Sequence, residues 1–189
     1  MKYIYTDGTQ SLSTLKEAMT NSMPSPNGLW LPDKFPKLLL NDSKKSFHDI
    51  IYMVLRALLS DEISDSILRT IIKESFNFSI PLVHLHDNIH ILELFHGPTM
   101  TFKDVGARFM ARIIRHLIPN KTITVVAATS GDTGGAVADA FCLLPNVNIN
   151  IFYPSGLISS IQEKQITSYG KNVKAYSVDG YFDDCQSIV

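Results

Sequence analysis

The stretch LELFHGPTMTFKDVGARFM, residues 92–110, carries the strongest structural signal in the chain. It passes from a loop rich in turn residues into an amphipathic helix, which the spacing of apolar residues predicts over 103–117. Lys103 stands at the junction, in the first helical turn. A lysine amine held there can act as a nucleophile toward a carbonyl group, so Lys103 is the first candidate catalytic residue. The alternative is an ordinary solvated lysine.

A second unusual run, ATSGDTGGA at residues 128–136, follows about two dozen residues later. It lies where a predicted strand meets the next helix, and ligands of open parallel sheets bind at the carboxyl ends of strands. Backbone N–H groups at a helix start attract anions, and glycine allows a close approach. Asp132 is the odd member, because a carboxylate repels an anion, and it could instead cap the helix. The candidate binding residues are Ser130, Gly131, Asp132, Thr133 and Gly134.

The lysine and the glycine-rich turn together indicate an aldehyde-type cofactor bound by the lysine and a charged substrate bound by the turn. The turn by itself is a weak signal, because a tight connection between a strand and a helix has the same composition. It matches neither the Walker pattern nor the GxGxxG pattern of nucleotide-binding loops.

Strands and helices alternate on both sides of these two motifs. Alternation of this kind is typical of βαβ units with a parallel sheet, so the fold class is α/β. The expected strands cover 82–86, 89–95, 123–128, 149–153 and 173–178, and the expected helices cover 103–117, 133–144 and 159–169.

The first 80 residues differ in character. Apolar residues at a helical period predict one helix around 50–59 and a second around 67–72. Residues 21–43 are dense in Pro, Asn, Ser, Asp and Gly, which predicts an extended loop. We therefore expect a small, mostly helical domain over 1–80, followed by an α/β domain that begins at 81 and runs to 189.

Composition and charge exclude several classes of protein. The chain is 45% hydrophobic and 19% charged with a net charge of −1, so no basic excess points to nucleic acid or to a membrane surface. Its two cysteines, Cys142 and Cys185, form no CxxC pair, and no secretory signal precedes them, which favours a cytoplasmic location. His84 and His86 could face a metal ion, but no third ligand has a clear spacing, so we expect no metal.

These motifs resemble the threonine synthase family, which belongs to the fold-type II enzymes that use pyridoxal 5′-phosphate (PLP). Residues 92–109 resemble the family's cofactor-lysine segment, and ATSGDTGGA resembles its Ser-Gly-Asp-Thr-Gly loop. Weaker similarities are found at 27–32, at Ser160-Ile161-Gln162-Glu163 and at 182–185. The resemblance implies that the family reaction, conversion of O-phospho-L-homoserine and water to L-threonine and phosphate, is the activity.

The resemblance also implies roles for individual residues. Lys103 would be the Schiff-base lysine and the acid–base group at the substrate carbons. The turn from Ser130 to Gly134 would bind the substrate carboxylate, and Ser130 would also help to seat the cofactor. Two alternatives stay open: another fold-type II PLP lyase, and a non-catalytic homologue that binds a phosphorylated small molecule.

The chain is short for that family. We expect it to be the N-terminal portion of a longer enzyme, inactive by itself, because no glycine-rich loop for the cofactor phosphate and no group for the pyridine nitrogen is recognisable before Val189. The sequence predicts no particular oligomeric state.

Overall fold

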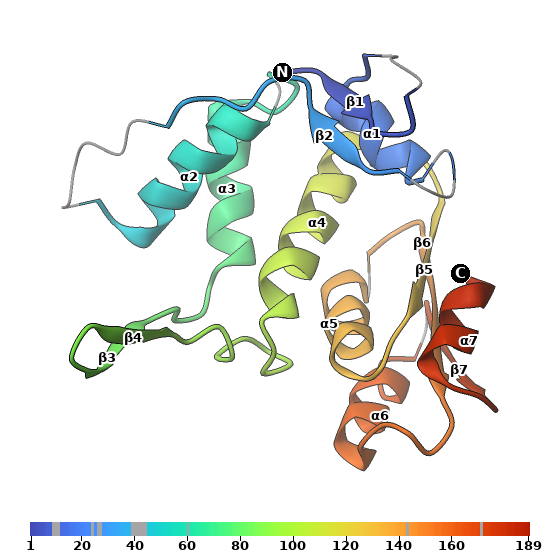
Figure 1. The fold of residues 1–189 in the computed structure, drawn as a ribbon. Helices are drawn as coiled ribbons and strands as arrows, with labels where there is room; N and C mark the ends of the chain where they lie inside the picture. The colour runs from blue at the N-terminus through green and yellow to red at the C-terminus, as the bar shows by residue number, and fades with distance from the viewer. Residues whose placement is uncertain are drawn as a thin grey trace. The chain divides into compact units, whose positions relative to one another are not determined.

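The computed structural model describes residues 1–8, 12–23, 25, 28–38, 45–59, 61–142, 144–170 and 172–189. The chain separates into two compact units, Met1–Glu74 and Ser75–Val189, and each is described by itself. Figure 1 shows the order of the helices and strands along the chain. Within the described residues, no helix is long and apolar enough to cross a membrane.

The first unit combines a small sheet with helices. Strands β1 (Tyr3–Tyr5) and β2 (Trp30–Pro32) pair antiparallel, and the helices are α1 (Leu15–Asn21), α2 (Phe47–Leu58) and α3 (Asp65–Ser75). A capping box of Thr14 and Glu17 begins α1, satisfying the N–H groups that every helix start leaves without partners. Ile63, Leu68 and Ile72 are buried almost completely.

The two helices that the sequence predicts in this unit are confirmed as α2 and α3. The sheet and α1 were not predicted, because strands of three residues carry too little alternation to be recognised. The extended loop expected over 21–43 is interrupted by β2, whose Trp30 ring lies 5.1 Å from that of Tyr5. Parts of that predicted loop, at 24, 26–27 and 39–43, lie outside the described residues.

The second unit contains a hairpin and a three-layered α/β body. The hairpin pairs β3 (Leu82–His86) with β4 (Ile89–Leu92). The body consists of strands β5 (Ile123–Ala128), β6 (Val147–Pro154) and β7 (Val173–Val178), which are parallel in the order 5-6-7. Its helices are α4 (Lys103–Leu117), α5 (Asp132–Phe141), α6 (Ser160–Thr167) and α7 (Phe182–Ile188).

This arrangement confirms the predicted α/β class and its parallel sheet. Figure 1 shows α5 and α6 on one side of the sheet and α7 on the other, while α4 packs along α5. Sequence and structure agree on the bounds of α4, β5 and β7. Strand β4 ends at Leu92, three residues short of the predicted strand end at 95.

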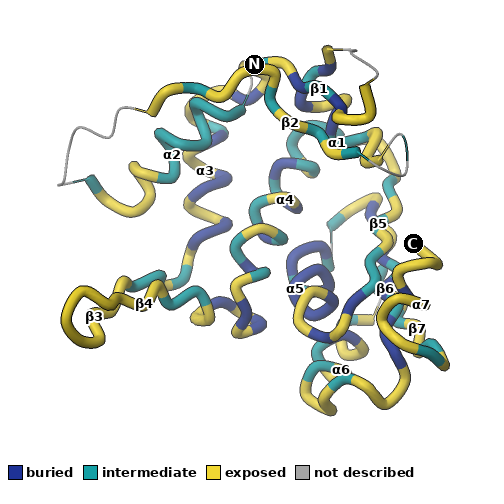
Figure 2. The backbone as a smooth tube through the Cα atoms, viewed as in Figure 1, coloured by how far each residue is buried: buried dark blue, intermediate teal, exposed yellow. Residues whose placement is uncertain are grey.

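Small residues on α5 allow it to lie close against the sheet. Its buried side is mostly glycine and alanine, and Figure 2 shows most of the helix buried after its exposed first turn. A Cβ atom at Gly134 would lie 2.6 Å from Thr129 and 3.1 Å from Ile151, which is closer than packed atoms approach. Gly134 thus allows α5 to begin directly above the carboxyl end of β5.

A buried ionic network joins α4 to α5 and to the segment that leads into the unit. The Arg108 guanidinium donates to Ser75 O, Asn77 Oδ1 and Asp139 Oδ2 at 3.1, 2.9 and 3.3 Å. The Tyr169 hydroxyl donates to the other oxygen of Asp139, at 3.2 Å. Burial, followed by the Asp139 charge, raises the pKa of Tyr169 well above its ordinary value. The network fixes α4, and with it the lysine at its start.

Candidate functional site

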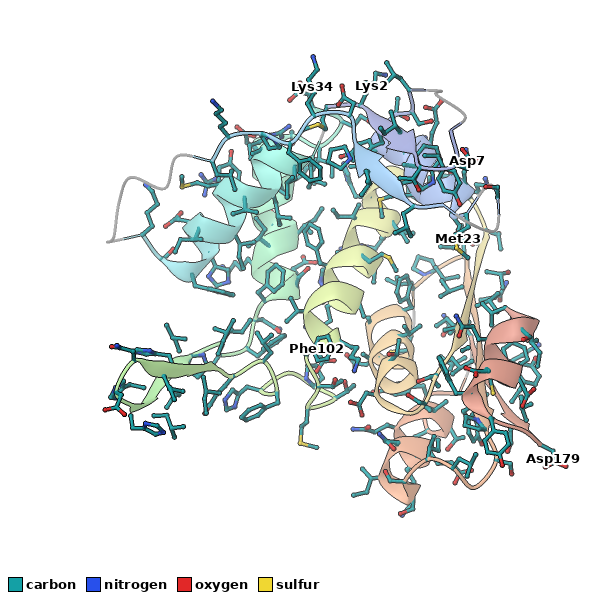
Figure 3. All side chains as sticks on the ribbon, in the orientation of Figure 1. Lys2, Asp7, Met23, Lys34, Phe102 and Asp179 are labelled. Carbon is teal, nitrogen blue, oxygen red and sulfur yellow. The ribbon has the colours of Figure 1, made fainter. Side chains whose placement is uncertain are left out.

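Lys103 is the first residue of α4 and lies beside the first residue of α5. Its Nζ atom is 3.7 Å from Asp132 Oδ2, and its side chain is 31% exposed. The Phe102 ring lies under the ammonium, with 4.1 Å between Nζ and the ring centre. Figure 3 shows Phe102 at the end of α4 where the helix begins. The amine is therefore accessible and lies next to the predicted anion-binding turn.

The loop that leads to Lys103 is held by a buried carboxylate that the sequence interpretation missed. Asp104 is fully buried and accepts hydrogen bonds from Thr99 N at 2.9 Å and Thr99 Oγ1 at 2.6 Å. Gly97 lies so close to Asp104 that a Cβ atom there would come within 2.4 Å of its Oδ2. Met100 adopts a φ of 58°, which is uncommon for a residue with a side chain. Asp104 thus fixes the conformation of the loop that precedes Lys103.

The Thr129 side chain holds the glycine-rich turn in place through hydrogen bonds to its backbone. Its hydroxyl is buried and accepts hydrogen bonds from Gly131 N at 3.0 Å and Gly134 N at 2.8 Å. Within the described part of the chain, the N–H groups of Asp132 and Thr133 have no hydrogen-bond partner. The donors available to a ligand therefore include those two N–H groups and the hydroxyls of the exposed residues Ser130 and Thr133.

The structure adds two details to the predicted turn. Asp132 is not the helix cap: the cap is Gly131, with φ 135° and ψ −81°, and Asp132 is the first residue of α5. The Gly131 and Gly134 N–H groups are not open to a ligand, because Thr129 already accepts from both. The two glycines shape the turn instead: Gly131 through its positive φ, and Gly134 through close packing.

Asp132 links three segments of the site. Its Oδ1 accepts a 2.8 Å hydrogen bond from Gln162 Nε2 of α6, and Thr101 Oγ1 donates to its Oδ2 at 3.4 Å. The Lys103 ammonium faces the same Oδ2. Strands β5 and β6 are neighbours and parallel, so the loops after their carboxyl ends meet at one edge of the sheet. That topology brings Gln162 to Asp132.

Removal of the Thr129 hydroxyl should destabilise the fold. Thr129→Val keeps nearly the same shape but leaves two buried N–H groups without an acceptor, at a cost of about 2–3 kcal/mol in the free energy of unfolding. Urea denaturation measures this change. Thr124→Val, on the exposed face of β5, the strand that precedes Thr129, is the matched control and should change stability by less than about 0.5 kcal/mol. Equal effects of the two variants would contradict this role of Thr129.

The histidines of the hairpin are not brought into a metal-type cluster. His84 and His90 face each other across the two strands with ring centres 5.0 Å apart, and His84 Nε2 bonds to Asp87 O. His96 pairs with Glu93 at 2.6 Å. Among the described residues, no group of three His, Cys, Asp or Glu side chains is arranged to hold a metal ion.

Comparison with known proteins identifies the family. A family model described as pyridoxal-phosphate dependent enzyme matches residues 63–189. The chain belongs to this enzyme family. A second model, described as threonine synthase N terminus, matches residues 2–76.

Similar proteins support the same assignment. Threonine synthase of Escherichia coli K12 is 41% identical over 177 residues, covering 92% of this chain and 41% of the relative. The Saccharomyces cerevisiae threonine synthase is 38% identical, covering 93% and 39%. The chain thus spans about two fifths of the length of these curated relatives.

Solved structures agree in fold. The crystal structure of threonine synthase from Escherichia coli matches with a TM-score of 0.93 at 38% identity, covering all of this chain and 45% of that one. The PLP-bound threonine synthase from Brucella melitensis matches with a TM-score of 0.88 at 35% identity and covers 43% of that chain.

The residues present fit the cofactor of this family. PLP carries an aldehyde, and the Lys103 amine is an accessible primary amine at the carboxyl edge of the sheet. Hydroxyl and N–H donors of the neighbouring turn lie at the start of α5, where the helix dipole favours negative charge. No other described lysine is the first residue of a helix that starts beside this turn.

Proposed function

We propose that this chain belongs to a threonine synthase and that the complete protein converts O-phospho-L-homoserine and water to L-threonine and phosphate. The observation that carries the proposal is the contact between Lys103 and the first residue of α5. It places the Lys103 amine 3.7 Å from the carboxylate of Asp132, a residue of the turn that is suited to an anionic substrate. Threonine synthases that cover nearly the whole chain support the choice of reaction.

Lys103 is proposed to bind the cofactor and to move protons. Its Nζ atom would bond covalently to the cofactor aldehyde, and when released it would take and return protons at the α and β carbons of the substrate. Bound PLP supplies an electron sink that stabilises negative charge on the substrate carbons. The Phe102 ring and the Asp132 carboxylate would orient the amine.

The turn from Ser130 to Gly134 is proposed to bind the substrate carboxylate. The N–H groups of Asp132 and Thr133 and the hydroxyls of Ser130 and Thr133 can donate to it, and Ser130 would also help to seat the cofactor. Gly131 and Gly134 would act through backbone shape rather than as donors.

The proposed function extends to the domains, the substrate and the location of the protein. We propose one domain over 1–80 of the threonine synthase type and the first part of the cofactor domain over 81–189. The partner is a small-molecule substrate. A cytoplasmic location is proposed from cysteine use, and Cys142 and Cys185 are not joined in a disulfide.

Phosphate release from O-phospho-L-homoserine by the full-length protein tests this function. We expect release of phosphate with formation of L-threonine in equal amount, dependent on added PLP. Release of ammonia and a keto acid would instead indicate a different lyase of this family. Tight binding of O-phospho-L-homoserine without turnover would indicate the non-catalytic homologue.

A further inference from the structure

We infer that Gln162 is a positioning residue that holds the Asp132 carboxylate over Lys103 and away from the substrate-binding turn. The inference rests on the proposed function only in treating Lys103 as the reactive amine. Gln162 lies on α6, outside both motifs that identify the site.

The side chain of Gln162 makes two directed contacts at once. Its Oε1 accepts from Ser159 N at 2.9 Å, which caps α6, and its Nε2 donates to Asp132 Oδ1 at 2.8 Å. The capping contact fixes the rotamer of the Gln162 side chain, so its amide N–H group points toward Asp132. Gln162, itself held at the start of α6, therefore restrains the Asp132 carboxylate.

The absence of a side chain at Gly131 leaves room for the contact between Gln162 and Asp132. An ideal Cβ atom at Gly131 would lie 2.4 Å from both Cδ and Nε2 of Gln162, so any side chain there would displace the amide. The turn and α6 thus fit together through the Gln162 amide.

The restraint explains how a carboxylate can lie in an anion-binding turn without occupying the N–H groups of that turn. Asp132 is about half exposed and lies at the start of α5, where the N–H groups of Asp132 and Thr133 are without partners among the described residues. A carboxylate that is free to rotate at a helix start is drawn to such groups, where it would compete with the substrate. Gln162 holds Oδ1 instead, and Oδ2 then faces Thr101 Oγ1 and Lys103 Nζ.

Removal of the Gln162 amide should therefore change how readily the Lys103 amine is freed. A neighbouring carboxylate favours the ammonium form of a lysine. Gln162→Met removes the donor, so Asp132 can turn toward the α5 N–H groups and the amine is freed at lower pH.

Reductive methylation of the cofactor-free, full-length protein measures this directly. Formaldehyde and cyanoborohydride are applied across a pH series, and mass spectrometry follows the labelling of the peptide that contains Lys103. We expect the pH of half-maximal labelling of Lys103 to fall in Gln162→Met. Lys121, which is exposed and remote in sequence, gives an internal reference that stays unchanged.

Ser159→Ala is the matched control for the helix cap. The Ser159 hydroxyl accepts from Gln162 N at 3.2 Å, so its loss weakens the start of α6 without removing the amide of Gln162. We expect no shift at Lys103 in Ser159→Ala. A shift of equal size and sign in Ser159→Ala, or no shift in Gln162→Met, would overturn the inference. The readout needs no turnover, so its failure is distinct from a failure to release phosphate.

Discussion

Replacement of Lys103 by alanine is expected to abolish covalent cofactor binding and to reduce phosphate release by roughly three orders of magnitude or more. The expectation follows from two lost roles of one amine: covalent attachment of the aldehyde, and proton transfer, which alone contributes about 10²–10⁴-fold. The visible absorbance of the bound cofactor and the rate of phosphate release from O-phospho-L-homoserine are the measurements. Stability should change little, because a partly exposed ion pair contributes about 0–1 kcal/mol.

Two further variants separate chemistry from charge. Lys103→Arg keeps a cation opposite Asp132 but cannot act as a nucleophile, because its guanidinium stays protonated, and it should be as inactive as Lys103→Ala. Lys121→Ala removes an exposed lysine elsewhere and should leave both measurements unchanged. A normal cofactor absorbance in Lys103→Ala would contradict the proposed role.

Replacement of Gly131 by valine is expected to weaken substrate binding by tenfold to several hundredfold. The φ of 135° at Gly131 is a conformation that side chains rarely adopt, and a Cβ atom would collide with the Gln162 amide. The turn must then rearrange, and loss of one or two hydrogen bonds to a charged group costs about 1.5–3 kcal/mol each. The KM for O-phospho-L-homoserine, obtained from the rate of phosphate release by the cofactor-loaded, full-length protein, measures the change.

Gly170→Val controls for backbone strain. Gly170 also has a positive φ, 52°, but has open space around it and precedes β7, at the amino edge of the sheet. Because the strands are parallel, that edge is opposite the turn. The control should lose stability through strain of about 1–3 kcal/mol while retaining substrate affinity. Normal affinity in Gly131→Val would show that the turn has no part in binding.

The α/β body could be predicted from sequence because its elements are long and strongly patterned. The apolar run of β5 and the helical stripe of α4 specify their own bounds, and their alternation determines a parallel sheet. The sheet of the first unit could not be predicted in this way. Strands β1 and β2 have three residues each and meet across more than twenty intervening residues, so their pairing depends on tertiary contacts such as Tyr5 against Trp30.

The reactive centre of the site was predictable, but its supports were not. Lys103 and the turn at 130–134 stand out by composition. Thr129 and Asp104 look ordinary in the sequence, and only the fold reveals that each is a buried acceptor for two donors. Gln162 lies 30 residues from Asp132 in the chain and reaches it only because β5 and β6 are neighbours. Polar partners of this kind are set by topology rather than by local pattern.

The most direct test of the central claim is the site of cofactor attachment. The full-length protein, loaded with PLP, is reduced with borohydride, digested, and mapped by mass spectrometry. We predict a pyridoxyl group on Lys103, in the peptide that carries the segment TFKDVGAR at 101–108, in stoichiometric amount. A pyridoxyl group on any other lysine, with Lys103 unmodified, would contradict the account.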